Sequence, residues 1–476
     1  MNKYYVTTAI PYVNAAPHIG HALEFLQGDT ITRYHKLLGQ EVMFLSGGDE
    51  NALKNVQAAE TAGKNVQKFV DENTAIFLDL AKHLNVKYDI FQKGSDIKKH
   101  FPSSQKLWKL CAKSGDIYSK VYKGLYCVGC ETFYDKDELN ENGECFEHPG
   151  KKLELVEEEN YFFKLSKYEK QLIKLISSDQ LKIYPETRKN EVLGFLKQGL
   201  KDISISRSNE RAKNWGVPIP GDKTQRMYVW FDALNIYQSG VGFGWDEKLH
   251  NKWWPADVHI IGKGIIRFHA VYWPAFLLSA KLKIPKEIFA HGYITVEGQK
   301  MSKTIGNVID PFKLIEKYGV DALRYYLLRE IPSYSDGDFS NNRFKELYNA
   351  DLANGLGNLV ARVSALAAKA ELSINDTEPK LKLYPEVENY LKEYRFDQAL
   401  EFIWNNKITS LDKKIDERKP WKLEGDKLSN SLKDIIQEIK TIAYNLKSFL
   451  PSTADNIIKQ LSGTITKRGA LFPRLE

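Results

Sequence analysis

The sequence predicts an α/β protein with a doubly wound parallel sheet, which an insertion splits and an all-α region follows. Strand-like and helical segments alternate over the first fifty residues and resume after about residue 225. Hairpin-like segments with clustered cysteines lie between them, and beyond Tyr318 only helical periodicity remains. Alternating strands and helices are typical of a parallel sheet, whereas a long stretch of helical periodicity indicates a bundle.

The individual elements follow from apolar spacing. Pro17 opens an amphipathic helix that runs to about Leu38. Short β-rich or apolar segments are the expected strands: Tyr4–Ala9, Val42–Leu45, Met227–Phe231 and Val258–Ile261. Apolar residues at i, i+3 and i+4 predict the C-terminal helices: Asp321–Arg329, Arg343–Ala370, Glu386–Ile415 and Leu428–Phe449.

These patterns divide the chain into four parts. The split sheet domain takes residues 1–112 and 225–320, and the insertion takes 113–224. A short linking region, 321–345, precedes the helical domain of 346–476. An insertion has therefore split one parallel-sheet domain.

Bulk composition excludes several classes of protein. The chain has 476 residues, of which 43% are hydrophobic, and this is enough for several cores. It contains no long uncharged apolar run and no signal-peptide pattern, so we expect a cytoplasmic protein with no membrane partner. The net charge of +7 suits a polyanion partner without requiring one. The chain ends at Glu476, soon after the helices and without an appended domain, and we therefore expect a monomer.

The first chemical motif is the run Pro17-His18-Ile19-Gly20-His21, where a strand hands over to a helix. Nucleotides bind at this place in open α/β sheets. His18 and His21 are three residues apart, so both rings face the same side of the first turn, where they can donate to phosphate oxygens. Gly20 allows a flat base to approach the backbone. Alone, the motif fits two ordinary surface histidines about equally well.

The second motif is a glycine-bounded loop, Gly298 to Gly306, that contains Lys300, Ser302 and Lys303. Its glycines permit the loop to close, and two lysines three apart can neutralise a departing pyrophosphate. This is catalysis by positioning and electrostatics, without a protein nucleophile. Taken alone, two such lysines are usually just solvated.

Three of the four cysteines lie within twenty residues of one another, which favours a metal over a disulfide framework. The C-x2-C and C-x2-H pairs have the spacing of a closed tetrahedral zinc site: Cys127, Cys130, Cys145 and His148. With four protein ligands there is no open position for water, so the zinc is expected to be structural.

The two phosphate motifs together resemble the H-I-G-H and K-M-S-K-S signatures of class I aminoacyl-tRNA synthetases, with Thr304 in place of the last serine. The runs Thr8–Asn14 and Tyr228–Tyr237 are similar to two runs of the methionyl-tRNA synthetases. That resemblance implies a Rossmann-like catalytic domain and an anticodon-binding helix bundle. It further implies ATP with Mg²⁺, L-methionine, and both initiator and elongator tRNA(Met) as partners.

The resemblance also implies roles for individual residues. ATP would be bound by the two signatures: His18, Gly20, His21, Lys300, Ser302 and Lys303. Of these, His18, His21, Lys300 and Lys303 would be catalytic. Asp49 would hold the methionine ammonium, and the rest of the methionine site would be lined by Ala9, Ile10, Tyr12, Trp230, Ala233, Leu234, Tyr237, Ile265 and His269. The anticodon would be contacted by Asn358, Arg362 and Trp421.

Two positions depart from the family pattern. Asn51-Ala52 stands where the family commonly has His-Gly, and Gly264 stands where it commonly has an aspartate that holds the ATP ribose. Losing such a bond costs about 1.5–3 kcal/mol unless another group substitutes. Two alternatives therefore stay open: another class I synthetase, for isoleucine, valine, leucine or cysteine, and a tRNA-binding protein that has lost aminoacylation.

Overall fold

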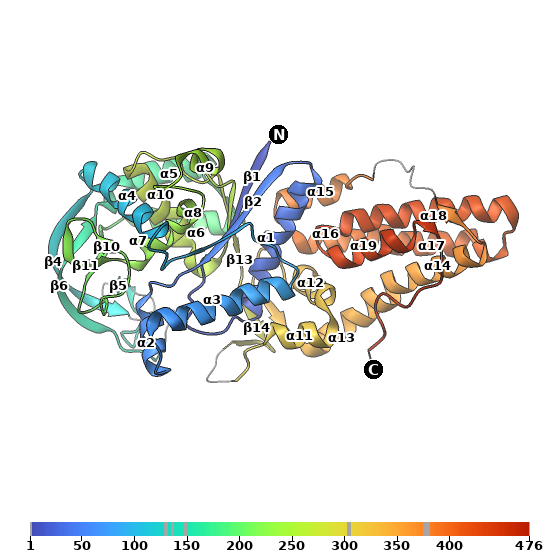
Figure 1. Cartoon of the computed structure of the whole chain (residues 1–476), viewed down its shortest axis with the longest axis horizontal. Helices are drawn as coiled ribbons and strands as arrows, with labels where there is room; N and C mark the ends of the chain where they lie inside the picture. The colour runs from blue at the N-terminus through green and yellow to red at the C-terminus, as the bar shows by residue number, and fades with distance from the viewer. Residues whose placement is uncertain are drawn as a thin grey trace. The chain divides into compact units, whose positions relative to one another are not determined.

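The computed structural model describes residues 2–127, 132–134, 138–146, 150–301, 306–374 and 381–475. The chain forms two compact units, and each is considered by itself. Unit 1 comprises residues 1–17, 40–81 and 87–290. Unit 2 comprises residues 18–39, 82–86 and 291–476. Both units therefore draw on segments that are distant in the sequence (Figure 1).

Unit 1 is organised around a six-stranded sheet of order β3-β2-β1-β12-β13-β7. Its strands are β1 Lys3–Thr8, β2 Glu41–Gly48, β3 Ile90–Lys93, β7 Lys182–Tyr184, β12 Val258–Gly262 and β13 Glu287–His291. β1 pairs in parallel with both β2 and β12, β2 with β3, and β13 with β7. With the helices that connect its strands, this sheet confirms the predicted Rossmann-like α/β fold.

The strand order reverses at β1. The chain runs outward from β1 through β2 to β3 on one side, and returns to the other side of β1 with β12. The central strands are buried on both faces, with Val6, Phe44 and Ile260 fully inaccessible. Ligands of open α/β sheets bind beyond the carboxyl ends of the strands at such a reversal. The fold therefore points to the loops that follow β1, β2 and β12.

The insertion between β3 and β12 is largely antiparallel. The long strands β4 (Ile117–Cys127) and β6 (Glu154–Phe163) form a hairpin-like ladder, flanked by β5 (Thr132–Tyr134) and β8 (Ile203–Ser204). A second small sheet joins the strands β9 Ser206–Ser208, β10 Pro218–Ile219 and β11 Asp222–Met227. The expected hairpins are thus present, and β7 also returns from this stretch to the edge of the main sheet.

The prediction of a strand at Met227–Phe231 is correct only for Met227 and wrong for the residues that follow. β11 ends at Met227, and Val229–Ala233 forms the short helix α7. A short, fully apolar run has no periodicity that separates a buried strand from a buried helix, and here the helix prevails. Similarly, the expected helix Glu386–Ile415 is interrupted near Tyr394, whose φ of 59° ends its first segment. The other expected strands and helices occur close to their predicted positions.

Unit 2 combines the N-terminal helix α1 (Ile19–Leu37) with the C-terminal helices. Arg324 on α12 (Val320–Arg329) is fully buried and donates to Asp29 of α1 at 2.7 Å and to the Phe449 carbonyl at 2.6 Å. Such a buried, fully engaged guanidinium fixes α1 against the C-terminal helices, because breaking one partner would leave an uncompensated charge.

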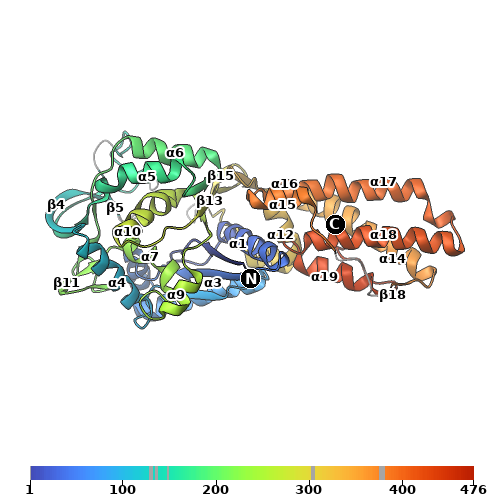
Figure 2. The ribbon, with the colours of Figure 1, turned by 90° about the horizontal axis from the view of Figure 1, so that it is seen from above.

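The last part of unit 2 is helical. Figures 1 and 2 show its long helices side by side: α14 Asn358–Lys369, α17 Thr409–Arg418, α18 Gly425–Leu446 and α19 Pro451–Gln460. The α18 side chains that face its neighbours, Ile435, Ile439 and Leu446 among them, are inaccessible to solvent. In the described part of the chain, every helix is too short or too polar to cross a bilayer.

Candidate functional site

In unit 1, the loops after β1 and β2 meet at a single bridge. Tyr12 and Asp49 form a parallel β-bridge, and the Asp49 N–H donates to the Pro11 carbonyl at 2.9 Å. The Asn55 side chain in turn donates to the Asp49 carbonyl at 2.7 Å. Asp49 is only 2% exposed, so the backbone around it is held from both sides. A carboxylate held in this way is suited to pair with a ligand cation.

An aromatic wall stands beside these loops. Trp230 on α7 stacks on Phe268, with ring centres 3.7 Å apart and planes 4° from parallel. The ring of Tyr12 meets Trp230 edge-on at 6.2 Å. The indole N–H of Trp230 is buried without a hydrogen-bond acceptor among the described residues. Such rings make favourable contacts with a polarisable thioether, worth about 0.3–1.5 kcal/mol each.

His269 is held in one protonation state. It follows β12 on the π-helical turn Phe268–Tyr272, where Nδ1 donates to the Ile265 carbonyl at 2.9 Å. Nε2 therefore accepts from the hydroxyl of Tyr237, 2.7 Å away. Burial lowers the pKa of His269 to about 4, although the bond to Ile265 acts to raise it. The imidazole is neutral at physiological pH and orients the tyrosine.

The remaining residues expected at the methionine site occupy the same part of unit 1. Ala9 directly follows β1, and its N–H donates to the Ile260 carbonyl of β12 at 3.0 Å. Ala9, Ala233 and Leu234 are buried, and Ile10 and Ile265 are half-buried. Leu234 lies between α7 and α8 (Ile236–Ser239), which carries Tyr237. The structure thus brings these side chains to the ends of β1, β2 and β12.

Asn51, one of the departures from the family pattern, has a clear structural role. Its amide nitrogen donates to the Gly94 carbonyl and to the carboxylate of Asp232, both at 2.8 Å. Burial raises the pKa of Asp232, and His100 and Asn51 act to lower it. The Oδ1 atom of Asn51 is buried without a donor among the described residues. Asparagine therefore supports a buried carboxylate beneath the aromatic wall.

In unit 2, His18 and His21 cap the first turn of α1. Nδ1 of His18 accepts the Gly20 N–H, and Nδ1 of His21 accepts the His18 N–H, each at 3.1 Å. The two ring centres lie 4.0 Å apart. A ring nitrogen that accepts a hydrogen bond carries no proton, so the proton of each neutral ring is on Nε2. Each Nε2–H is therefore a donor at a helix N-terminus, where anions bind.

Gly20 leaves room for the His18 ring in this cap. A Cβ atom at position 20 would lie 2.9 Å from Cε1 and 3.1 Å from Nδ1 of the His18 ring. The first separation is shorter than real Cβ contacts and the second is tighter than most, so the His18 ring would have to shift. Desolvation, together with His18 and His291, lowers the pKa of His21 well below its ordinary value. His21 is therefore neutral and donates a hydrogen bond without carrying a charge.

The lysine loop is described in part. β14 (Ile294–Val296) and β15 (Gln299–Lys300) form a hairpin, and Asp338 accepts from the Gly298 N–H at 2.8 Å. Lys300 is exposed at its end. Ser302 and Lys303 lie outside the described residues. After the loop, the Ile309 carbonyl accepts from the Ile19 N–H at 3.2 Å, so its exit is tied to the residue next to His18.

Two of the four expected zinc ligands are described. Cys127, at the end of β4, and Cys145 are both buried, and their sulfur atoms lie 3.2 Å apart. This is far longer than a disulfide bond and shorter than the ~3.8 Å expected between sulfurs that share one ion at ~2.3 Å, so the two sulfurs already converge. Cys130 and His148 lie outside the described residues. The described residues therefore contain only two of these ligands, and they contain no group of three or more possible metal ligands.

Two of the three residues expected at the anticodon lie together in unit 2. The guanidinium of Arg362 is 6.0 Å from the ring centre of Trp421, and both lie at the C-terminal helices. Arg362 also contacts Asp412 and Asp416, each at 3.2 Å. Trp421 is 47% exposed, and Asn358 is exposed one turn before Arg362 on α14. An exposed indole beside a guanidinium is suited to stack with a base.

Gly264 is exposed in the short turn Lys263–Ile265 and has no side chain to offer a ribose. Sequence reasoning missed two other residues. Phe268 forms half of the aromatic wall, and its position beside His269 was the available signal. Asp232 lies inside a run that resembles the family, yet its bond to Asn51 joins segments 181 residues apart. That distance in sequence hides the pair from any local pattern.

Comparisons with known proteins agree on one family. The sequence model described as "tRNA synthetases class I (M)" matches residues 4–364. The methionine–tRNA ligase of Thermotoga maritima is 41% identical over 97% of this chain and 75% of its own length. That of a Nostoc species is also 41% identical, over 96% of this chain and 89% of its own length.

Solved structures agree as well. The methionyl-tRNA synthetase of Mycobacterium tuberculosis, in complex with methionyl-adenylate, superposes with a TM-score of 0.92. It is 37% identical, and the match covers 100% of both chains. The apo form of the Mycobacterium tuberculosis protein superposes with a TM-score of 0.85 at 34% identity.

Proposed function

This chain belongs to the class I tRNA synthetases of the methionine type, and from that premise we propose roles for its residues. It is an aminoacyl-tRNA synthetase that activates methionine and charges tRNA. The observation that supports this most strongly is the family match across residues 4–364, which takes in the loops after β1, β2 and β12. ATP supplies the activating group, and its Mg²⁺ neutralises phosphate charge when bound.

The methionine side of the reaction belongs to unit 1. The carboxylate of Asp49 pairs with the methionine ammonium, and the thioether lies against Trp230 and Tyr12. Tyr237, oriented by neutral His269, completes the wall. The other lining residues are Ala9, Ile10, Ala233, Leu234 and Ile265. These groups orient the substrate and leave its carboxylate unshielded, so that one of its oxygens can attack phosphorus.

The phosphate side of the reaction is assigned to the two histidines and the lysine loop. A methionine carboxylate oxygen forms a bond to the α-phosphorus of ATP, the bond to the bridging oxygen breaks, and pyrophosphate leaves with that electron pair. His18 and His21 donate their Nε2–H groups to phosphate oxygens, and Gly20 keeps the cap open to the nucleotide. Lys300 and Lys303 neutralise the charge that builds on pyrophosphate, and Ser302 contributes to ATP binding. A hydroxyl of the terminal ribose at the tRNA 3′ end then attacks the activated carbonyl, its ester bond to the carbonyl forms, and AMP leaves.

The remaining sequence-based boundaries are part of the same proposal. Residues 1–112 and 225–320 form the catalytic domain, 113–224 the connective insertion, and 321–345 a stem-contact linker. Residues 346–476 read the anticodon of initiator and elongator tRNA(Met). Since charged tRNA is consumed in translation, we place the enzyme in the cytoplasm and take it to act as a monomer.

The proposed activity has a direct test. ATP–pyrophosphate exchange is measured with each of the twenty amino acids in turn, in the absence of tRNA. Exchange that depends on methionine is expected, because its thioether suits the aromatic wall and its ammonium suits Asp49. Exchange that depends on isoleucine or cysteine would redirect the assignment to another class I enzyme, and no exchange at all would leave only tRNA binding.

We further propose a structural zinc held by Cys127, Cys130, Cys145 and His148. The buried, converging sulfurs of Cys127 and Cys145 support it. Bound zinc would supply folding energy to the insertion and take no part in the chemistry. Metal analysis of the wild type should find one zinc per chain. A Cys145→Ser variant is expected to lose most of this zinc.

The matched control for the zinc experiment is Cys111→Ser. Cys111 is also buried, but its sulfur contacts the Phe276 carbonyl in the α/β core. This variant should retain its zinc. Chelation should make residues 113–224 the first segment cut by a protease, because the insertion loses its cross-link. Full zinc retention in Cys145→Ser would contradict the ligand set.

For the anticodon we propose contacts from Asn358, Arg362 and Trp421. Trp421→Ala is expected to lower kcat/KM for charging about tenfold, since stacking on a base contributes about 1–3 kcal/mol. The exchange reaction involves no tRNA and should keep its rate. Trp421→Phe retains a stacking face and should recover most of the loss. Equal losses in charging and exchange would indicate misfolding of the variant and would contradict the assigned contact.

A further inference from the structure

The two short helices that carry the aromatic wall depend on their surroundings for their position. Trp230 lies on α7, which has five residues, and Tyr237 lies on α8, which has four. Such helices are not stable by themselves, because isolated helices shorter than about 12–15 residues are marginal in water. The side chains that pack on α7 and α8 from outside the methionine site therefore decide where the two rings lie.

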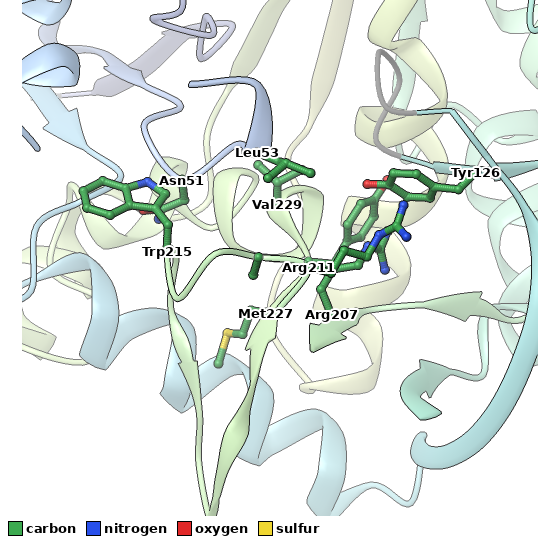
Figure 3. A pocket seen from close by; sticks show the side chains of 10 residues that line it. Asn51, Leu53, Tyr126, Arg207, Arg211, Trp215, Met227 and Val229 are labelled. Carbon is green, nitrogen blue, oxygen red and sulfur yellow. The ribbon is translucent and has the colours of Figure 1, made fainter. Parts of the chain in front are cut away.

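One side of α7 borders a small pocket. It is lined by Val229, the first residue of α7, and by Asn51 and Leu53 among others, and Figure 3 shows Asn51 and Trp215 together on one side of it. The pocket has a volume of ≈ 30 Å³, which holds about one water molecule and is too small for a substrate. Apolar packing is incomplete on this side, so α7 has to be fixed by other contacts.

A buried histidine from a third helix lies against both short helices. His100 is the first residue of α4 (His100–Lys113), and its side chain is completely buried. Its Nδ1 lies 2.9 Å from the hydroxyl oxygen of Ser239, the last residue of α8. Its Nε2 lies 3.9 Å from Oδ1 of Asp232 on α7, an oxygen that is buried without a hydrogen-bond donor among the described residues. One imidazole thus links α8 to α7.

The rest of the first turn of α4 holds the corner between α7 and α8. The amide nitrogen of Asn235, which lies between these helices, donates to the hydroxyl oxygens of Ser103 at 2.8 Å and Ser104 at 3.2 Å. The hydroxyl oxygen of Ser104 also lies 3.3 Å from Nε2 of His100. All four side chains are completely buried. A dry polar network has strict geometric requirements, so it favours one arrangement of α4, α7 and α8 over its alternatives.

On the substrate side, both rings rest on a single element. Trp230 stacks on Phe268, and the hydroxyl of Tyr237 donates to His269. Phe268 and His269 are neighbours on the π-helical turn Phe268–Tyr272. The aromatic wall is therefore held between this turn and the buried first turn of α4. Without the contacts of α4, the two rings would lose one of the two supports that fix their separation.

We propose that His100 is a positioning residue of the methionine site, which fixes Trp230 and Tyr237 relative to each other and so limits the length of the side chain that the site accepts. The inference rests on the proposed function, because it concerns the selection of the same substrate. His100 acts through Ser239 and Asp232 and takes no part in the chemistry.

The experiment measures ATP–pyrophosphate exchange with methionine and with ethionine, whose side chain is one methylene longer. The wild type should prefer methionine about tenfold or more in kcat/KM, since one methylene in a pocket changes this ratio about 10–200-fold. His100→Ala should lower the preference about three- to tenfold and raise KM for methionine, while KM for ATP stays near the wild-type value. The preference and the KM values do not depend on the fraction of active enzyme, so partial misfolding does not imitate the effect.

Two conservative variants separate the contacts of His100 and carry the test if His100→Ala does not fold. His100→Asn places an amide near the position of Nδ1 and can keep the bond to Ser239. His100→Gln places an amide near the position of Nε2 and can keep the contacts with Ser104 and Asp232. Each should show a preference for methionine between those of His100→Ala and the wild type. An unchanged preference in every folded variant, equal losses of kcat/KM for the two amino acids included, would overturn the proposal.

The matched control is Ser114→Ala, at the other end of α4. The Ser114 hydroxyl donates to the Ser279 carbonyl at 2.7 Å, so this variant also removes a hydrogen bond made by α4 but leaves its first turn intact. Its preference for methionine and its KM should be those of the wild type. A preference lowered as far as in His100→Ala would mean that any loosening of α4 changes the site, and the specific role of His100 would be lost.

Exchange by the wild type separates this inference from the proposed function. Methionine-dependent exchange, together with a preference that the variants of His100 leave unchanged, would overturn only the positioning role. Absence of methionine-dependent exchange in the wild type would instead deny the proposed function itself. The two failures are therefore distinguishable in one set of measurements.

Discussion

A Gly20→Ala variant is expected to lose methionine-dependent pyrophosphate exchange by a factor on the order of 10², with little change in stability. The added Cβ would lie 2.9 Å from the His18 ring, which must swing away and give up its bond from the Gly20 N–H. The Nε2–H of His18 then no longer points where phosphate charge develops. Loss of one such preorganised donor costs about 10²–10³ in kcat.

Two opposing terms keep the stability of this variant near that of the wild type. Losing the cap costs about 0.5–2 kcal/mol, and alanine in place of glycine in a helix returns about 1 kcal/mol. Thermal unfolding should therefore shift by a few degrees at most, while exchange collapses. The experiment thus separates a catalytic from a structural role, which a histidine deletion does less cleanly.

The control for Gly20→Ala is Gly194→Ala. Gly194 lies in α6 (Glu186–Lys197), and an added Cβ there would have nothing within 4 Å. The chemical change is the same, and the exchange rate should be that of the wild type. If Gly20→Ala also retained its full rate, the close contact with His18 would have no functional meaning, and the donor role of the cap would fail.

The sequence was sufficient for the class of fold and for most of the segments that carry the site. Apolar spacing placed the strands that flank the chain reversal at β1, because parallel strands buried on both faces read as short apolar runs. The same property caused the error at Val229–Ala233, where an apolar run is a helix. Local pattern alone does not distinguish the two, and burial against Phe268 and Trp108 decided it.

Chemical detail depended on contacts that a sequence does not contain. The spacing of His18 and His21 predicted a shared face, but the tautomers follow from which nitrogen accepts a backbone N–H. Gly20 was predicted to let a base approach the backbone, and the structure adds that a Cβ at this position would meet the His18 ring. From the sequence, Asn51 was only a departure from the family pattern, whereas the structure shows its hydrogen bond to Asp232. Each of these is a pair of groups set by the fold.

An Asn51→Asp variant is expected to be destabilised strongly at neutral pH and much less in mild acid. The substitution places a second carboxyl group 2.8 Å from the buried carboxylate of Asp232, in a place where burial already raises the pKa of Asp232. Two buried carboxylates cannot both ionise without a cost of about 3–5 kcal/mol. Losing the donor to the Gly94 carbonyl adds about 1–3 kcal/mol at every pH.

The sign of the pH dependence follows from the direction of the shift. The new carboxyl has a folded pKa above its unfolded value of about 3.9. Between those two values the folded chain binds more protons than the unfolded chain, so stability falls as pH rises. The free energy of unfolding of variant and wild type is measured by urea denaturation at pH 4.5 and pH 7.5. The deficit of the variant relative to the wild type should be about 3 kcal/mol larger at pH 7.5 than at pH 4.5.

The double variant Asn51→Asp with Asp232→Asn identifies the cause of this loss. It restores one carboxyl and one amide to the same two positions with their places exchanged, so the repulsion disappears while the hydrogen bond between them can reform. Most of the stability lost at pH 7.5 should return, and the difference from wild type should become nearly independent of pH. Two results would contradict this account: a stability deficit of Asn51→Asp that is the same at both pH values, or a double variant that regains no stability at pH 7.5. Either result would mean that the Asn51–Asp232 bond does not control the ionisation of this buried carboxyl.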